Sequence, residues 1–134
     1  MRIYLAARYS RLDEMEEVAD RLRKMGHMIT SRWHRGDHKL EDYLVGTAEG
    51  IEKQLTFAMD DIQDLNDAEC VINFAEPLRS PTRGGRLVEQ GMAIASWKWN
   101  IKVGGHETVF DALPVVSHVA NVDELYSLLE EEMD

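Results

Sequence analysis

A strand pattern that passes through a short loop directly into a helix pattern limits this chain more than any other feature. The segment Cys70-Val-Ile-Asn-Phe-Ala75 is rich in β-branched and aromatic residues, which is typical of a buried strand. Serine, proline and glycine mark residues 80–85 as a loop, and apolar residues recur at helical spacing over residues 86–95. Strand, loop and helix in this order form the repeating unit of α/β proteins.

The N-terminal part of the chain shows the same alternation. Residues 2–7 predict a first strand. Ser10 is the expected N-cap of a helix whose apolar face runs to Met25, and Gly26 stands at the C′ position that ends it. Residues 28–30 predict a second strand, so the chain begins with a β-α-β unit.

The rest of the chain continues the pattern after one polar interruption. Residues 31–49 are polar, contain glycine and predict a mobile loop or lid. Apolar residues at spacings of three and four predict a helix over residues 51–65. Residues 101–105 predict a strand, residues 113–119 a short edge strand with a proline near its start, and residues 123–133 a closing amphipathic helix.

These elements predict a single-domain α/β protein over residues 1–134, Rossmann-like or flavodoxin-like, with a mostly parallel sheet and helices on both faces. The length suits one hydrophobic core. Ligands of such sheets bind beyond the carboxyl ends of the strands, near the point where the strand order reverses. The loops at residues 7–10, 75–85 and 104–110 are therefore the expected site.

Composition and charge limit the partners. The hydrophobic fraction of 44% and the charged fraction of 30% are typical of a soluble globular protein, and no stretch predicts a membrane span or a signal peptide. The single cysteine, Cys70, cannot form an internal disulfide, so we expect a cytoplasmic protein. A net charge of −10 opposes binding of a nucleic-acid polymer. Arginines at positions 79, 83 and 86 nonetheless allow a small anion to bind locally.

Several common motifs are absent. The chain has no G-x-x-x-x-G-K-[ST] phosphate loop, no G-x-G-x-x-G dinucleotide fingerprint and no G-x-S-x-G nucleophile elbow. The histidines have no compact zinc-ligand spacing, and the i,i+4 pair His34 and His38 lies in a polar segment where such spacing is usually coincidental. What remains is a set of carboxylates near an arginine- and glycine-containing loop.

Four segments together resemble the nucleoside 2-deoxyribosyltransferase and 2′-deoxynucleoside 5′-phosphate N-hydrolase superfamily. They are Ile3–Ala7, Asp61–Ile72, Gly85–Ala95 and Ile101–Gly105, and their order and separation carry the likeness more than any one of them. Members of this family are α/β proteins that cleave or exchange the N-glycosidic bond of deoxynucleosides or their 5′-monophosphates. The resemblance implies a small-molecule substrate, no metal or organic cofactor, and a homo-oligomer.

The resemblance places three catalytic roles on this chain. Glu89 matches the family nucleophile that attacks the anomeric carbon, Asp61 an aspartate that assists the departing base, and Tyr4 a tyrosine that orients the nucleophile. The helix pattern sets Glu89 in about the first turn, where we expect the backbone N–H groups to keep its carboxylate ionised. The alternatives are a helix-stabilising acid, an exposed aspartate and a core aromatic, respectively.

The remaining candidate residues would bind the substrate. Tyr9 and Trp33 are flat rings that can stack on a base. The loop before the 86–95 helix offers charge, hydroxyls and backbone N–H groups for a 5′-phosphate, through Arg79, Ser80, Thr82, Arg83, Gly84 and Gly85. Arg83 stands six positions before Glu89, where the transferases have an acidic residue and the monophosphate hydrolases a serine, which favours a phosphorylated substrate over a free nucleoside.

The sequence therefore predicts an enzyme that cleaves or exchanges the N-glycosidic bond of a deoxynucleoside or its 5′-monophosphate, through a covalent glycosyl-enzyme intermediate on glutamate. One alternative is a nucleotide sensor that uses the same pocket without turnover. Another is an interaction protein whose acidic C-terminal segment recruits a partner. The choice between purine and pyrimidine, and between hydrolysis and transfer, stays open at this point.

Overall fold

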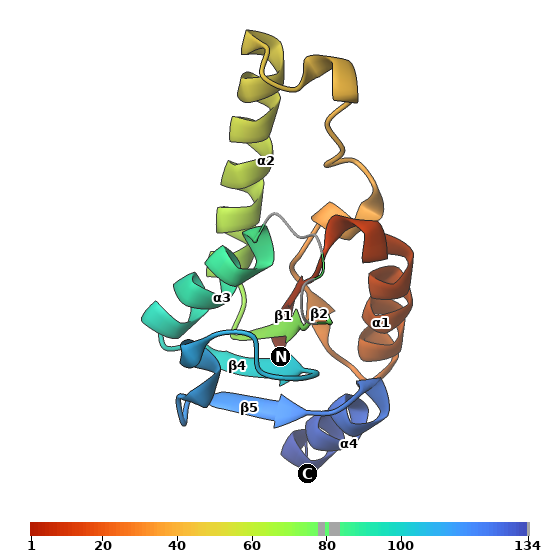
Figure 1. The fold of residues 1–134 in the computed structure, drawn as a ribbon. Coiled ribbons are helices and arrows are strands. Elements are labelled where there is room, and N and C mark those ends of the chain that lie inside the picture. Colours follow the sequence, from red (N-terminus) through yellow and green to blue (C-terminus); the bar gives the residue numbers. More distant parts are fainter. Residues whose placement is uncertain (78–79, 81–83, 134) are drawn as a thin grey trace.

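The structure is a computed structural model that describes residues 1–77, 80 and 84–133. Strands and helices alternate along these residues (Figure 1). The strands are β1 (Arg2–Ala6), β2 (Met28–Ile29), β3 (Cys70–Phe74), β4 (Trp99–Val103) and β5 (Val116–Val119). The helices are α1 (Leu12–Lys24), α2 (Ala48–Asn66), α3 (Gly85–Ala95) and α4 (Val122–Met133).

The strands form one sheet in the order β2-β1-β3-β4-β5, and every neighbouring pair is parallel. This is the flavodoxin-like strand order, so the predicted α/β fold with a parallel sheet is confirmed. The chain runs from β1 outward to β2 and then returns to the other side of β1, where Tyr4 of β1 stands opposite Val71 of β3. The strand order thus reverses between β1 and β3.

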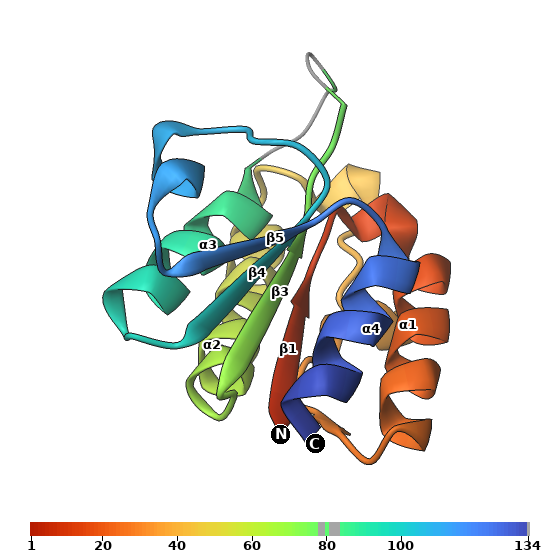
Figure 2. The ribbon, with the colours of Figure 1, turned by 90° about the horizontal axis from the view of Figure 1, so that it is seen from below.

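Helices cover both faces of the sheet, with α1 and α4 on one face and α2 and α3 on the other (Figure 2). All of β3 is buried, as expected of a parallel strand with both faces covered. Leu22 of α1, Ala93 of α3, and Leu125 and Leu129 of α4 point into this core. The predicted inward face of the C-terminal helix is therefore confirmed.

Helix α2 differs from the other helices because much of its length projects beyond the sheet (Figure 1). Its buried residues are Gly50 near the start and Asp64 and Leu65 near the end. A Cβ at Gly50 would overlap the backbone carbonyl of Leu44, which belongs to the preceding 3-10 turn, Asp42–Leu44. Glycine at this position lets the first turn of α2 pack directly on that 3-10 turn.

The predicted helix over residues 51–65 is confirmed, but most of its apolar positions face away from the body. Ile51, Leu55, Met59 and Ile62 are exposed by 58%, 59%, 61% and 44%, and we call these four residues the α2 stripe. Within the described residues, no helix is long and apolar enough to cross a membrane, α2 included.

Two boundaries near the N-terminus test the capping predictions. Ser10 was predicted as an N-cap, and this is wrong: it lies inside a 3-10 turn, Tyr9–Arg11, and α1 begins only at Leu12 without a side-chain cap. Gly26 has a φ of 98°, the left-handed conformation that glycine adopts after a helix, so the predicted helix end is confirmed.

The predicted loop over residues 31–49 is more ordered than its composition indicated. It contains two 3-10 turns, Trp33–Arg35 and Asp42–Leu44, before α2 begins at Ala48. The Trp33 indole is buried and donates from Nε1 to the carbonyl oxygen of Leu5 at 2.7 Å. The start of this segment is therefore part of the core, because one aromatic ring anchors it to β1.

Candidate active site

A cavity of about 480 Å³ opens beyond the carboxyl end of β1, beside the point where the strand order reverses. Its walls come from four parts of the chain that are distant in sequence. The residues that line it are Ala7, Arg8, Tyr9 and Ser10 after β1, Trp33, His38, Lys39 and Leu40 before α2, Gln54, Phe57 and Asp61 on α2, and Gly84, Gly85, Arg86 and Glu89 at the start of α3. The predicted loop at residues 104–110 does not contribute.

Glu89 lines this cavity from α3, but its electrostatic environment differs from the prediction. The helix begins at Gly85, so Glu89 lies in the second turn and gains less from the helix N-terminus than a first-turn acid. Burial raises the pKa of its carboxyl to about 8, the nearby Tyr4 hydroxyl opposes part of the rise, and the charge of Asp61 adds to it. Desolvation therefore opposes the expected ionisation of Glu89 and outweighs the helix dipole.

Tyr4 lies on β1 behind Glu89 and is completely buried. Burial and the neighbouring carboxylates, Glu89 before Asp61, raise the pKa of its phenol, so the hydroxyl keeps its proton. Within the described residues the hydroxyl makes no hydrogen bond of ordinary geometry, although it is close enough to Glu89 to affect that carboxyl. Tyr4 and Glu89 are thus close to each other but are not joined by a hydrogen bond.

Asp61 faces the same cavity from α2. Burial raises the pKa of its carboxyl to about 6, His38 opposes the rise, and Asp64 and Asp60 add to it. The neighbouring Asp60 does not line the cavity and lies 3.5 Å from the Arg32 guanidinium. A carboxyl that holds its proton to a higher pH than usual suits proton donation to a leaving group.

His38 is a site residue that the sequence reasoning set aside. Its side chain is only 7% exposed, and its Nε2 atom lies 3.6 Å from Oδ1 of Asp61. The ring stacks on Phe57 of α2, with a centroid distance of 4.8 Å. His34 points elsewhere and contacts Glu16 and Ser31 at 2.7 Å each, so the i,i+4 spacing was indeed coincidental. Only the path of the 31–47 segment brings His38 to the cavity.

Four buried polar atoms at this site have no hydrogen-bond partner among the described residues. They come from different elements, β1, the segment before α2, α2 and α3, and they are Tyr4 Oη, His38 Nε2, Asp61 Oδ1 and Glu89 Oε2. Buried polar groups in folded proteins are almost always paired, with protein, water or ligand. Their convergence indicates a site built to receive a polar ligand.

Aromatic and basic side chains complete the cavity. Tyr9 and Trp33 both line it, with their ring centroids 6.1 Å apart and their planes inclined by 44°. Trp33 is held in the core by its hydrogen bond to β1, so it forms a fixed wall. Arg8 and Lys39 add positive charge to the lining of a protein whose net charge is −10.

Part of the predicted phosphate loop can be placed. Gly84 is the N-cap of α3, with a left-handed φ of 82°, and it lines the cavity together with Gly85, the first residue of the helix. Ser80 is described and half-buried but does not line the cavity. The other residues of the predicted cradle, Arg79, Thr82 and Arg83, lie outside the described residues.

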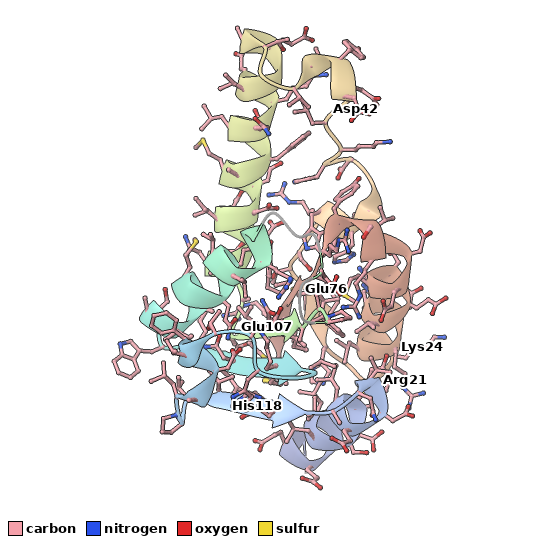
Figure 3. The ribbon with its side chains drawn as sticks, viewed as in Figure 1. Arg21, Lys24, Asp42, Glu76, Glu107 and His118 are labelled. Atoms are coloured by element: carbon pink, nitrogen blue, oxygen red, sulfur yellow. The ribbon has the colours of Figure 1, made fainter. Side chains whose placement is uncertain are left out.

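A network of charged side chains ties the start of α3 to β4 and to the loop that follows β4. Glu107, at the end of the loop after β4, accepts two hydrogen bonds from the Arg86 guanidinium at 2.5 Å each and lies 2.6 Å from Nζ of Lys102. Asp111 accepts a hydrogen bond from Gln90 at 2.6 Å and lies 3.5 Å from Lys102. Figure 3 labels Glu107 near α3 and the sheet, and Glu107 is not among the residues that line the cavity.

No protein-family model matches the chain, and no curated protein matches it. Among the described residues, no group of three or more histidine, cysteine, aspartate or glutamate side chains is placed to hold a metal ion.

Glu89 should make stability fall as the pH rises. Its pKa of about 8 in the folded protein lies above the ordinary value of 4.5, so the folded state binds more protons between these values and the free energy of unfolding falls from about pH 4.5 to about pH 8. Glu89→Gln should remove at least about 2 kcal/mol of this fall, since one pKa unit corresponds to about 1.4 kcal/mol. Urea unfolding at several pH values measures it, with Glu52→Gln on exposed α2 surface as control. Parallel pH curves for wild type and Glu89→Gln would contradict it.

Proposed function

We propose that this protein cleaves or exchanges the N-glycosidic bond of a 2′-deoxynucleoside 5′-monophosphate or deoxynucleoside. The observation that carries the proposal is the convergence on one cavity of two half-buried carboxyls, Glu89 and Asp61, each with a buried oxygen atom that has no hydrogen-bond partner among the described residues. Two carboxyl groups at one site, one as nucleophile and one as proton donor, are the usual machinery of glycoside cleavage. The resemblance of the sequence to the deoxyribosyltransferase and N-hydrolase superfamily selects the substrate class.

The proposed reaction has two steps. In the first, the ionised Glu89 attacks C1′ of the sugar, the C1′–N bond breaks, and the base leaves with its electron pair and a proton from Asp61. In the second, water or an acceptor base attacks C1′, Glu89 leaves as a carboxylate, and Asp61 takes back a proton. The reactive state is the one in which Asp61 holds a proton and Glu89 is ionised. Tyr4, which keeps its proton, is placed to hold the nucleophile in position.

The lining of the cavity supports a nucleotide as ligand. Tyr9 and Trp33 offer ring surface for the base. Gly84 and Gly85 open α3 at the cavity, and the N–H groups at a helix start, with Arg8 nearby, favour a phosphate. The single, buried cysteine is in keeping with the cytoplasm as the place of action.

The test is a chromatographic assay of the base released from a panel of deoxynucleosides and their 5′-monophosphates, with and without an acceptor base. Release that needs no acceptor identifies a hydrolase, and release that requires one identifies a transferase. Greater release from monophosphates than from free nucleosides would support the anion-binding role of the helix start. If the wild-type protein binds nucleotides but releases no base, the sensor hypothesis takes the place of the enzyme.

We further propose that the protein acts as a homo-oligomer joined through the α2 stripe. Its residues Ile51, Leu55, Met59 and Ile62 recur at spacings of four, four and three, which places them on one face of the helix, and all four are exposed. The stripe lies on a different side of α2 from Phe57 and Asp61, so a second α2 can pack on it without filling the cavity. A second copy of the chain offers a matching stripe, as an isologous interface requires.

Leu55→Glu should convert the oligomer to a monomer. A charge in the middle of an apolar seam is left unpaired on association, so we expect association to weaken by at least about 100-fold, or about 3 kcal/mol. Thr56→Glu adds the same charge one residue away, outside the stripe, and should leave the oligomer intact. Sedimentation velocity over a range of concentrations measures both. A wild-type protein that is monomeric throughout that range would refute the proposed interface.

A further inference from the structure

The contacts of His38 extend the proposed function to a residue outside the set taken from the family resemblance. The imidazole comes from the segment before α2 and lies between two carboxylates, with Nδ1 2.8 Å from Oδ1 of Asp37 and Nε2 3.6 Å from Oδ1 of Asp61. A neutral ring whose Nδ1–H donates to Asp37 presents an Nε2 lone pair to Asp61. A charged ring presents an N–H there instead. In both states one proton fits between the ring and Asp61.

Leaving buried polar atoms without hydrogen bonds costs free energy, so the unpaired atoms of His38 and Asp61 call for an explanation. The His38 side chain is 7% exposed, and neither its Nε2 nor Asp61 Oδ1 has a hydrogen-bond partner among the described residues. Stacking on Phe57 fixes the plane of the ring from the α2 side. A shift of less than about 1 Å would close the gap to hydrogen-bond length, and catalytic hydrogen bonds often tighten in this way when substrate binds.

Among the residues that the structure describes, three carboxylates lie within 4 Å of the His38 ring. Asp37 lies on its own segment, and Asp60 and Asp61 lie on α2, with Oδ2 of Asp60 3.7 Å from Nε2. The Arg32 guanidinium is bound to Asp60 and Asp64, at 3.5 and 2.9 Å, and so neutralises the carboxylates behind the pair. Asp61 is the carboxylate of the three that also lines the cavity.

We propose that His38 is a positioning residue for Asp61, that the two hold one proton between them, and that Asp37 orients the ring. The proposal rests on the glycosidic function proposed above. While the C1′–N bond breaks, the shared proton passes from Asp61 to the leaving base. When water or an acceptor resolves the intermediate, its proton returns to Asp61 and the pair is restored. His38 keeps the Asp61 carboxyl aimed at the base and protonated at the moment of departure.

The first test needs no catalysis. ¹⁵N NMR at pH 6 reports the protonation of the two ring nitrogens of His38 in the wild type and in Asp61→Asn. We expect a smaller fraction of doubly protonated His38 in Asp61→Asn, because a carboxylate partner has been replaced by an amide. His106, which is exposed and stacks on His118 away from the cavity, should be unchanged. An unchanged His38 spectrum in Asp61→Asn would overturn the proposal.

The second test uses the base-release assay with His38→Gln. For an ordinary substrate we expect kcat to fall by about 10- to 100-fold with KM changed by less than about threefold, since proton transfer to a leaving group is typically worth about 10²- to 10⁴-fold. For a 7-methylguanine deoxynucleotide, whose base is already cationic and leaves without a proton, the loss should shrink to less than about threefold. Equal losses on both substrates would show a purely structural role and overturn the proposal. His106→Gln is the matched control.

The two tests separate the two proposals. If the wild type releases no base from any substrate, the glycosidic function fails, and the NMR comparison alone decides whether His38 and Asp61 share a proton. If base is released but neither the spectrum nor the substrate dependence changes, the function stands and the role of His38 falls.

Discussion

Glu89→Gln should lower base release by at least about 10³-fold, because it removes the atom that forms the bond to C1′ while leaving the shape of the site almost unchanged. The amide has the size of the carboxyl, and burial already raises the pKa of the carboxyl it replaces to about 8, so an uncharged group suits the same surroundings. The fold should therefore be kept. Chromatography of released base under single-turnover conditions measures the loss without interference from product release.

The control is a glutamate on the same kind of element but away from the cavity. Glu52→Gln lies on exposed α2 surface and should retain full activity. Trapping with a slow substrate adds a direct observation, since mass spectrometry of the denatured wild-type protein should show one deoxyribosyl adduct that Glu89→Gln lacks. Base release that persists in Glu89→Gln within about tenfold of the wild type would rule out Glu89 as the nucleophile.

Lys102→Met should destabilise the folded protein by about 3–5 kcal/mol, the usual cost of removing one partner from a buried ion network. Lys102 is fully buried, and its ammonium group contacts Glu107 at 2.6 Å and the side-chain carbonyl of Gln90 at 3.2 Å. Methionine fills similar space but removes the positive charge that lies beside the carboxylates of Glu107 and Asp111. The free energy of unfolding from urea titration is the measurement.

Lys53→Met provides the matched comparison. The Lys53 side chain is about half exposed and lies 4.0 Å from Glu49 on the surface of α2, so its removal should change stability by less than about 0.5 kcal/mol. A loss below about 1 kcal/mol for Lys102→Met would mean that the network relaxes around the missing charge and does not hold α3 in place.

The ion network that supports the start of α3 could not be found in the sequence. Lys102 occurs in the predicted strand 101–105, and nothing in the local pattern distinguishes a buried lysine there from one at a sheet edge. Its burial depends on Glu107 and Asp111, which reach it only after the 104–112 loop folds back under α3. Long-range ion pairs of this kind have no local signature.

The parts of the site that the sequence did predict are those fixed by the order of elements. Tyr4, Asp61 and Glu89 lie on β1, α2 and α3, and a parallel sheet with its order reversed between β1 and β3 brings these elements together. The raised pKa of Glu89 has no signature in the sequence, because a helix pattern reveals the dipole but not the depth of burial. His38 was missed for a related reason, since its position depends on the course of a segment that has no periodicity.

The glycine contact between α2 and the turn before it has a mechanical consequence. Because Gly50 is pressed against the Leu44 carbonyl, the Asp42–Leu44 turn and α2 form one stiff arm, and this arm carries Phe57 and Asp61. The other end of the preceding segment is tied to β1 through Trp33. The α2 side of the cavity is therefore held at both ends, by this backbone contact at one end and by buried Asp64 and Leu65 at the other.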